Sequence, residues 1–436
     1  MTASQPWHPT RAGALACAAG VVVLAVGVLL GRADAALMGV PLVLGGLLGH
    51  RSLPSGSTDV SFDDVGPDAD PGTIAETLRV RAADGAASVQ VRVYAPGHRP
   101  AVVVVPAGEP RALEVRLDSV RTGPNHTFEV YARGYGDLGA HAEDTRVLGA
   151  RERLVLPEAS RLQRVPLPTR LRGLTGPRRS RRQGDGTELR DIHPMGPGDR
   201  MRRVDWRATA RMSPQLDQLF VRRTLATAEA GAVLVMDSRD DVGPDLHTWR
   251  GSEPLRVDEA TSLDLARHAA ASIAAALVAN GDRVGLEDLA RRRRPLAPAA
   301  GQRHLRRILH ALALSAPVGE PAARLRPPQL SNDVIVYLFT TLLDDAPLTL
   351  VRRWCEQGVP VVVVDTLPGL HPVAERHLRL AWRITSMERA DRTRELEALG
   401  VPVVRWTGQE RVRTARRFEE LVRGAERHRP VVGGRR

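Results

Sequence analysis

The sequence predicts an α/β fold in which a doubly wound, mostly parallel sheet follows a transmembrane helical hairpin and a small antiparallel β-sandwich. Three observations predict it: an apolar stretch near the N-terminus, short alternating segments over 73–160, and Val- and Leu-rich strands that alternate with amphipathic helices from residue 230 onward. Such strands belong to parallel sheets that helices cover on both faces. With 436 residues, the chain is long enough for two or three domains.

Residues 12–50 are predicted to form the transmembrane hairpin, after an N-terminal tail over 1–11. Residues 12–30 are uncharged and as a helix would span about 28 Å, close to the hydrocarbon thickness of a bilayer. The apolar residues 35–49 would form a shorter second span. A cleaved signal peptide is the alternative, because Arg11 supplies a charged start and Ala33-Asp34-Ala35 is typical of a cleavage site.

Two spans return the chain to the side of the membrane on which it starts. Arg11 and Arg32 lie on opposite sides of the first span, so the local arginine count does not fix the orientation. Cys17 and Cys355 are far apart in the chain, and the absence of paired cysteines permits a reducing compartment. We therefore expect a two-span protein of the cell (inner) membrane with its soluble body in the cytoplasm.

The soluble part begins with a predicted linker over 51–72, which is rich in Ser, Gly, Pro and Asp. The β-sandwich is predicted over 73–160, where apolar and polar residues alternate with a period of two between turn signals. No His, Cys or Asp cluster there has catalytic spacing, so we interpret it as a structural or interaction module. Its strands are predicted at 77–82, 88–95, 101–107, 112–120, 126–134 and 151–157.

The α/β domain is predicted over 230–425, before a tail over 426–436. Its strands are predicted at 230–238, 282–290, 332–342, 359–368 and 401–406, and its helices at 262–281, 301–316, 346–358, 375–400 and 410–424. Such sheets bind ligands at the carboxyl ends of their strands. The residues predicted there are Asp237, Ser238, Arg239, Asp240, Thr340, Thr341 and Asp365.

The composition excludes several classes of enzyme. The chain has a net charge of +12 but contains no lysine, which P-loop, Schiff-base and pyridoxal enzymes each require. The two cysteines form neither a disulfide framework nor a zinc site. Much of the positive charge is concentrated in residues 161–223, which hold sixteen arginines and six acidic residues.

The Arg-rich segment over 161–229 is predicted to be more than a solvated tail. A turn at 196–199 is followed by Asp205 and Trp206 among arginines, a pattern that favours local ion pairs and stacking. This pattern predicts an ordered loop or short helix packed on the α/β domain. A solvated Arg-rich linker is the structural alternative. The functional alternative is nonspecific binding of nucleic acid or anionic lipid by the arginines. Of these, we do not expect nucleic acid to be a partner.

Within this segment the sequence resembles a known signature. It runs Gly-Asp-Gly-Thr-Glu-Leu-Arg-Asp at 184–191, Pro-Gly-Asp at 197–199 and Arg-Val-Asp-Trp-Arg-Ala-Thr-Ala-Arg at 203–211. This order closely resembles the signature of the domain of unknown function 58 family. The whole chain also resembles the family in its order of parts. These parts are a membrane hairpin, a β-rich module, the signature and a von Willebrand factor type A-like α/β domain. The sequence departs from the pattern at His193 and Pro194, where the family more often has an aromatic residue.

The resemblance implies a partner and a degenerate metal loop. Family members resemble partners of MoxR-type AAA+ ATPases, thought to serve as scaffolds or adaptors in assembling other proteins. Type A domains often hold a divalent cation with an Asp-x-Ser-x-Ser loop, a Thr and a further Asp. This chain keeps Asp237 but has Arg239 and Asp241 in place of the serines, and the acid nearest to Thr340 and Thr341 is Asp344. We therefore expect no metal site and no cofactor.

We expect a membrane-anchored, non-catalytic scaffold that binds a protein partner, such as a MoxR-type AAA+ ATPase. A hydrolase that uses strand-end acids or a histidine is the alternative, but His193, His247, His268 and His304 lie in no recognised catalytic motif. The residues that we expect to form the interaction motif are Gly186, Glu188, Arg190, Gly198, Asp199, Arg203, Asp205, Trp206, Arg207 and Arg211.

Overall fold

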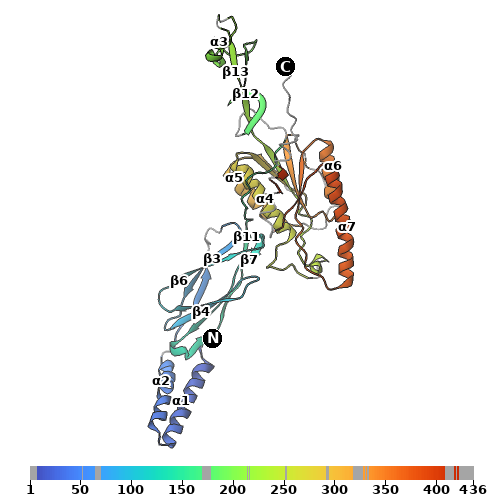
Figure 1. The fold of residues 1–436 in the computed structure, drawn as a ribbon. Helices are drawn as coiled ribbons and strands as arrows, with labels where there is room; N and C mark the ends of the chain where they lie inside the picture. The colour runs from blue at the N-terminus through green and yellow to red at the C-terminus, as the bar shows by residue number, and fades with distance from the viewer. Residues whose placement is uncertain are drawn as a thin grey trace. The chain divides into compact units, whose positions relative to one another are not determined.

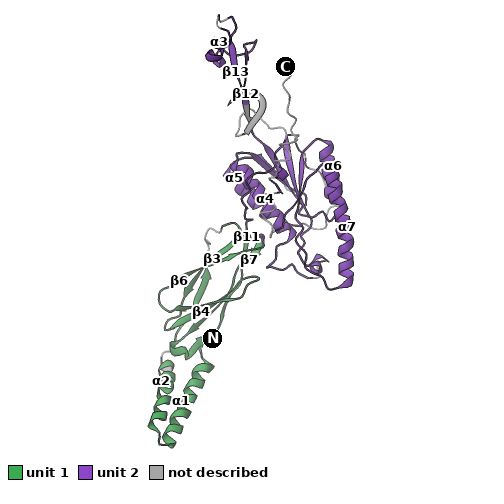
Figure 2. Ribbon diagram, in the orientation of Figure 1, with its two compact units in different colours: residues 1–120, 124–155 green, residues 121–123, 156–436 purple. Residues whose placement is uncertain are grey.

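The protein divides into two compact units in the computed structural model (Figure 2). Unit 1 comprises residues 1–120 and 124–155, and unit 2 comprises residues 121–123 and 156–436. The structure describes residues 7–51, 53–63, 70–168, 178–213, 215, 217–250, 253–290, 294–317, 328, 330, 333–407, 417–418 and 420–421.

Unit 1 contains two apolar helices, α1 (Arg11–Leu29) and α2 (Ala33–Arg51), which pack as a hairpin (Figure 1). The Thr10 side chain caps α1 by accepting a hydrogen bond from the amide of Gly13. The helices approach closely at glycines: a Cβ added to Gly27 would lie 2.3 Å from the nitrogen of Ala36, and one added to Gly20 would lie 2.7 Å from the Cβ of Leu42. Small residues let apolar helices pack backbone against backbone.

The outward faces of this hairpin are apolar, and among its exposed side chains are Leu15, Val22, Leu29, Leu37, Met38 and Leu48. Helix α1 is long and apolar enough to cross a membrane, whereas the apolar part of α2 (Ala33–Gly49) is shorter. The same test selects Ser262–Ala279, but 83% of that helix is buried inside unit 2, so we interpret it as a core helix. Two apolar N-terminal helices with exposed apolar faces indicate membrane association.

The rest of unit 1 is built from antiparallel strands. One sheet has the order β1-β9-β8-β4-β5, with β10 paired to β8, a second has the order β2-β3-β6, and β7 pairs with β11. Their bounds are β1 Trp7–Pro9, β2 Asp59–Phe62, β3 Thr73–Arg81, β4 Ser88–Tyr94, β5 Ala101–Pro106, β6 Arg111–Asp118, β7 Gly123–His126, β8 Glu129–Tyr135, β9 His141–Glu143, β10 Arg146–Leu148 and β11 Glu152–Val155. Apolar side chains from both larger sheets share one core that includes Leu78, Val91 and Val130.

Two of these strands correct the boundaries predicted from the sequence. Residues 7–9, predicted to belong to a tail, form β1, which pairs with β9, and Trp7 is buried and donates a hydrogen bond to the carbonyl of Gly56. Residues 59–62, predicted to belong to the linker, form β2, which pairs with β3. Both segments are short and polar on one side, and only their pairing with distant strands stabilises them.

Unit 2 contains a six-stranded sheet of order β16-β15-β14-β17-β18-β19. Neighbouring strands are parallel except for the edge strand β16, which is antiparallel to β15, so the sheet is mixed. The antiparallel strand was not predicted. The bounds are β14 Gly231–Met236, β15 Arg283–Asp288, β16 Leu296–Ala299, β17 Val334–Thr340, β18 Val361–Asp365 and β19 Val403–Arg405.

Helices cover both faces of this sheet (Figure 1). Helices α4 (Ser262–Ala279) and α5 (Gln302–Ala313) pack on the face that carries Leu234 and Tyr337. Helices α6 (Ala346–Glu356) and α7 (Arg376–Ala398) pack on the opposite face. Consecutive strand residues point to opposite faces, which is why both faces of an all-apolar strand need a cover. The helix predicted over 410–424 lies mostly outside the described residues.

The Arg-rich segment was expected to form an ordered loop or a short helix packed on the α/β domain, and its described residues form a β-hairpin with a short helix at the tip. Strand β12 (Arg178–Pro194) pairs with β13 (Phe220–Ala228), and the register runs from Pro194 with Phe220 near the tip to Arg178 with Ala228 at the base. The tip carries the 3₁₀ turn η2 (Met201–Arg203) and the short helix α3 (Trp206–Met212). Phe220 and Ala228 are separated by about 26 Å of extended strand, so the tip is distant from the point where β13 leads into β14.

Candidate functional site

Asp199 orders the turn at the hairpin tip. Its Oδ2 accepts a hydrogen bond from the amide of Gly196 at 3.0 Å and lies 3.2 Å from Nε2 of His193 and 3.9 Å from Nη2 of Arg223. These contacts, with the Gly196 amide the largest cause, lower the pKa of the Asp199 carboxyl. Gly198 has a φ of 92°, a conformation that favours glycine and lets the turn reverse. Asp199 and Gly198 therefore fix the backbone ahead of α3.

Asp205 and Thr209 hold α3 against β13. The Asp205 carboxylate caps α3 by accepting a hydrogen bond from the amide of Ala208 at 3.0 Å. The backbone amide of Asp205 donates a hydrogen bond to the carbonyl of Phe220 at 2.8 Å. The buried Thr209 hydroxyl accepts from the amide of Phe220 at 3.0 Å. Arg222 adds an ion pair to Asp205 at 3.5 Å. A seven-residue helix is marginal in isolation, so these contacts account for its presence.

The tip exposes the apolar and cationic side chains of the motif. Trp206 is 60% exposed, and Met201 and Met212 are exposed to a similar degree. Arg207 and Arg211 are exposed on α3, while Arg203 ends η2 and is half-buried. Of the predicted motif residues, the structure brings those from Gly198 to Arg211 together at the tip, whereas Gly186, Glu188 and Arg190 lie along β12.

A second cluster lies at the carboxyl end of β14, where the guanidinium of Arg239 contacts Asp237. Nε and Nη2 of Arg239 donate to the two carboxylate oxygens of Asp237 at 2.7 and 2.9 Å. Thr340, at the end of β17, donates its hydroxyl to Asp237 at 2.9 Å. The side chains of Arg239 and Asp237 are 6% and 7% exposed. The pair is therefore largely removed from water.

Asp344 completes this cluster. Its Oδ2 lies 2.8 Å from Nη1 of Arg239, and its Oδ1 accepts from Nη2 at 3.1 Å. Burial opposes the charge of Arg239, but the two carboxylates outweigh it and raise the pKa of Arg239.

The loop that carries Asp344 contains Leu342, a buried residue with a positive φ of 57°. The carbonyl of Leu342 accepts a hydrogen bond from Arg392. Such a backbone costs about 1–3 kcal/mol and persists because its surroundings hold it.

These residues do not fit the divalent cation that type A domains often hold. The guanidinium of Arg239 engages both carboxylates and supplies the positive charge that a metal ion would otherwise bring. Among the described residues, no group of three His, Cys, Asp or Glu side chains is placed to hold a metal ion.

Two other residues predicted at the strand ends, Ser238 and Asp365, also have polar partners. Ser238 donates to Asp288 at the end of β15. Asp365 at the end of β18 forms an ion pair with Arg389 of α7, whose Nε donates to the carbonyl of Thr341 at 2.8 Å. On the loop after β14, partial burial of the Asp240 carboxyl is the largest cause that raises its pKa, and repulsion from the Asp237 carboxylate is the second.

The four histidines considered as catalytic candidates have structural contacts. Trp406 Nε1, which is only a donor, donates to Nδ1 of His268 at 3.0 Å, so the proton of the neutral ring lies on Nε2, 3.0 Å from the hydroxyl of Ser160. This tautomer donates to Ser160 and does not serve as its base. Buried His304 contacts the carbonyl of Val284 at 2.7 Å. His193 contacts Asp199, and His247 lies 3.5 Å from Glu375.

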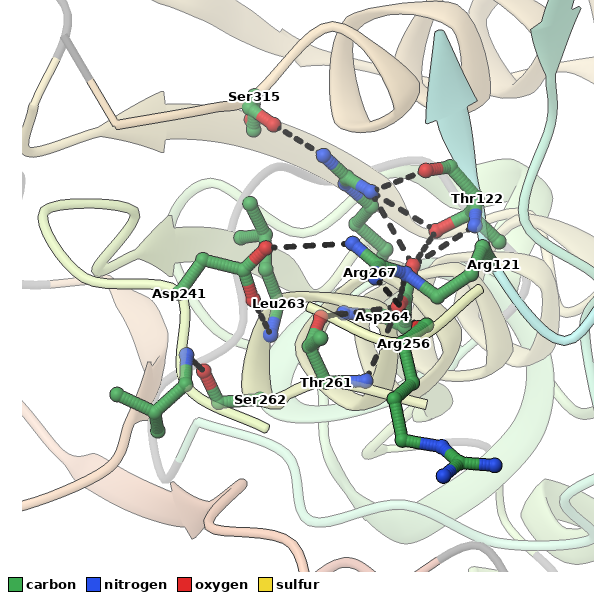
Figure 3. Close-up of polar contacts among 11 residues, drawn as sticks. Arg121, Thr122, Asp241, Arg256, Thr261, Ser262, Leu263, Asp264, Arg267 and Ser315 are labelled. Atoms are coloured by element: carbon green, nitrogen blue, oxygen red, sulfur yellow. Dashed lines mark hydrogen bonds and ion pairs between the residues drawn. The ribbon is translucent and has the colours of Figure 1, made fainter. Parts of the chain in front are cut away.

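Sequence reasoning missed a buried ionic network at the start of α4 (Figure 3). The two oxygens of Asp264 accept from the amide and hydroxyl of Thr122, both at 2.7 Å, and from the amide and hydroxyl of Thr261 at 3.1 and 2.9 Å. Arg121 lies 2.6 Å from Asp264, and Arg267 donates to the carbonyl of Thr122 at 2.6 Å.

Two further features belong to this network. Asp241 accepts from the amide of Leu263 at 3.3 Å and pairs with Arg121 at 3.6 Å (Figure 3). Gly123 has a φ of 89°, and a Cβ there would lie 3.0 Å from the guanidinium of Arg267. The only signal in the sequence was the Thr261 and Asp264 spacing of a helix capping box, which does not reveal that Arg121 and Thr122 join it.

One protein-family model matches a segment that includes residues of both the hairpin and the sheet. Residues 191–367 match the family described as protein of unknown function DUF58. Over this segment, which is less than half of the chain, the sequence is similar to the DUF58 family. No curated protein matches the chain. The DUF58 match begins at Asp191 in β12 and ends just beyond β18, so it includes the hairpin tip and the Asp237, Arg239 and Asp344 cluster. Gly186, Glu188 and Arg190 lie just before it.

Proposed function

We propose that this protein is a membrane-anchored, non-catalytic scaffold that binds a protein partner through the tip of its β-hairpin. The observation that carries the proposal is an exposed Trp206 on an ordered segment. Exposed apolar side chains that gather in one patch mark interaction sites, and Trp, Met and Arg are enriched in protein interfaces. Met201, Trp206 and Met212 with Arg207 and Arg211 give the tip this composition.

The order of the tip supports recognition rather than nonspecific attraction. A flexible basic tail would lose conformational entropy on binding, whereas the capped helix α3 and the turn at Asp199 present their side chains in one arrangement. The exposed arginines favour a partner surface that carries acidic residues around an apolar pocket for Trp206. The resemblance to the family points to a MoxR-type AAA+ ATPase as that partner.

The cluster of Asp237, Arg239 and Asp344 at the carboxyl ends of β14 and β17 supports a non-catalytic role. We propose that the sheet of unit 2 is a von Willebrand factor type A-like domain in which Arg239 replaces the metal ion. Asp237 and Asp344 are engaged by a guanidinium, so neither is free to act as a general base. The apolar helices α1 and α2 would anchor the protein in the cell membrane, with the strands of unit 1 and the whole of unit 2 on the cytoplasmic side.

The experiment is capture of the partner by full-length protein in detergent, followed by mass spectrometry. The Trp206→Ala variant should lose most of the captured MoxR-type ATPase, and Asp205→Ala should weaken capture because it removes the cap of α3. Asp205→Ser, which keeps a capping oxygen, should retain capture. Val147→Ala, which truncates an exposed apolar side chain of unit 1, is the matched control. Equal capture by wild type and Trp206→Ala would contradict the proposal.

A further inference from the structure

A short loop of unit 1 packs against the ends of both helices of the apolar hairpin. This loop is the 3₁₀ turn η1 (Asp137–Gly139), which follows β8. The Thr10 hydroxyl, at the start of α1, donates a hydrogen bond to the carbonyl of Gly139 at 2.6 Å, and the Thr10 amide donates one to the carbonyl of Ala140 at 2.8 Å. In the last turn of α2, a Cβ added to Gly49 would lie 2.5 Å from the Cβ of Ala140. The loop is therefore held at a fixed position on the hairpin.

The side chain of Leu138 extends from this loop along α2, toward the interior of the apolar stretch. The carbonyl oxygen of Asp137 lies 3.4 Å from the position of a Cβ at Gly49, whereas Cδ1 of Leu138 lies 3.6 Å from the position of a Cβ at Gly45. These two glycines are four residues apart, which is about 6 Å along a helix. The apolar part of α2 is Ala33–Gly49, so the end of the Leu138 side chain is about one helical turn inside it.

The fold of unit 1 does not account for a leucine at position 138. Its side chain is 75% exposed, so it contributes little to the core. Its backbone has a φ of 53° and a ψ of 15°, a left-handed conformation that crowds the Cβ of a leucine and that glycine adopts freely. Leu44 and Leu48, within one turn of Gly45, are 50% and 58% exposed. Leu138 therefore extends the exposed apolar surface of the hairpin, although leucine disfavours this backbone.

We propose that Leu138 inserts into the hydrocarbon edge of the bilayer and holds the strands of unit 1 against the membrane surface. This inference rests on the proposed anchoring of α1 and α2 in the membrane. Lipid is the occupant because the apolar surface around Leu138 is continuous with the surface of the hairpin that faces the acyl chains. A soluble partner would have to displace lipid from around Gly45 to reach this side chain. With α1, α2 and Leu138 as three points of contact, the strands of unit 1 have one orientation on the membrane.

The experiment is fluorescence quenching in full-length protein that carries a fluorophore on a single cysteine, in a Cys17→Ser, Cys355→Ser background. The vesicles contain phosphatidylethanolamine and phosphatidylglycerol, with or without a lipid that has a nitroxide near the carbonyl end of one acyl chain. A label at Leu138→Cys should be quenched as strongly as a label at Leu44→Cys, because Leu44 is next to Gly45 on α2.

Val120→Cys is the matched control for a site in water. Val120 is an apolar residue of unit 1 that is 48% exposed. Ser55, just after α2, pairs with Asp84 near the end of β3 that is closer to the membrane. Val120 lies near the other end of β3, about 26 Å away, because Asp118 pairs with Thr73 there. The label at Val120 should therefore be as bright with the nitroxide lipid as without it.

The label at Leu44 distinguishes the two ways in which the experiment could fail. If the label at Leu138 is as bright as the one at Val120 while the label at Leu44 is quenched, the insertion of Leu138 is wrong and the membrane anchor stands. If the label at Leu44 is not quenched either, the anchor is wrong, and the insertion of Leu138 with it.

Photolabelling of the wild-type protein tests the same contact without a substitution. In vesicles that contain a lipid with a diazirine near the carbonyl end of one acyl chain, light should attach the lipid to the peptide that contains Leu138 and to the part of α2 around Gly45. The Leu138→Gly variant, in which glycine suits a φ of 53°, should lose the adduct on the loop. Adducts on α2 of the wild type without any on the loop would overturn the proposal, because Leu138 would then face water or another protein.

Discussion

The Arg239 guanidinium forms a two-point hydrogen bond with the Asp237 carboxylate, with Nε to Oδ1 at 2.7 Å and Nη2 to Oδ2 at 2.9 Å. The same guanidinium bridges to Asp344 on the loop after β17. One cationic side chain therefore links the carboxyl ends of two neighbouring strands. This arrangement leads to the first prediction.

Replacing Arg239 by Ser should destabilise unit 2 by about 3–5 kcal/mol, because Asp237 is left as a buried charge without its partner. Added Mg²⁺ should recover part of the loss in the variant by supplying the missing positive charge, and should leave the wild-type unfolding midpoint unchanged. Thermal unfolding with and without the ion measures both effects.

The control for this prediction is Arg256→Ser. The ion pair of Arg256 with Asp258 is exposed to water, which weakens it, so its removal should leave the unfolding midpoint close to that of wild type. Stabilisation of the wild-type protein by Mg²⁺ would contradict the assignment of Arg239 as the resident cation.

The buried network at α4 gives the second prediction. Asp264→Ala removes the acceptor shared by Thr122 and Thr261, together with the carboxylate that lies 3.3 Å from the guanidinium of Arg267, a residue that is 4% exposed. The expected loss is about 3–5 kcal/mol in a denaturant titration that follows unit 2. Asp258→Ala, a change of the same chemistry at the surface, should stay within about 0.5 kcal/mol of wild type. Equal losses in the two variants would mean that the network adds no stability.

Asp241 supplies a prediction on pH. Burial is the largest cause that raises the pKa of its carboxyl above the ordinary value, and hydrogen bonding from Thr261 opposes it. The folded protein therefore holds this proton more tightly than the unfolded chain. The contribution of Asp241 to stability should fall as pH rises from about 3.9 through the raised pKa.

The measurement compares unfolding free energies of wild type and Asp241→Asn across this pH range. The stability of wild type relative to the variant should fall with rising pH and then level off, because asparagine does not titrate. The slope is the readout, and the attraction of Arg121 for the ionised carboxylate is already part of the pKa of Asp241. Parallel curves for the two proteins would refute the raised pKa.

The packing of α1 against α2 gives the fourth prediction. A Cβ at Gly46 would lie 2.8 Å from the Sγ and 2.9 Å from the Cβ of Cys17. This Cβ separation is shorter than that of an ordinary disulfide, so Gly46→Cys should form a disulfide with Cys17 on mild oxidation after a small separation of the two helices. Loss of maleimide labelling in a Cys355→Ser background measures it. Gly45→Cys is the control, because the atom nearest its added Cβ is in Leu138 rather than Cys17. Protection of both variants, or of neither, would show that the helices pack differently.

Several elements could be predicted from the sequence because their signals are local. The uncharged run at 12–30 and the Val-rich strands around 233 and 362 each carry a hydrophobic pattern that one segment displays by itself. The signature at 184–211 likewise indicated the DUF58 family, because its residues lie within one short stretch of the chain. Trp206 was predicted as an interaction residue for the same reason, since its neighbours in the chain are also its neighbours at the hairpin tip.

Other features were decided only by tertiary structure, because their signals are divided between distant segments. Strands β1 and β2 exist through pairing with β9 and β3, and the antiparallel edge strand β16 exists through pairing with β15. Arg239 was predicted to oppose a metal ion, but its bridge to Asp344 required the loop after β17. The sequence by itself therefore predicted the apolar helices, the α/β class and the resemblance to the DUF58 family, but not that the sheet is mixed. The tertiary structure determined which charges meet, because an ion pair depends on separation in space and not on separation along the chain.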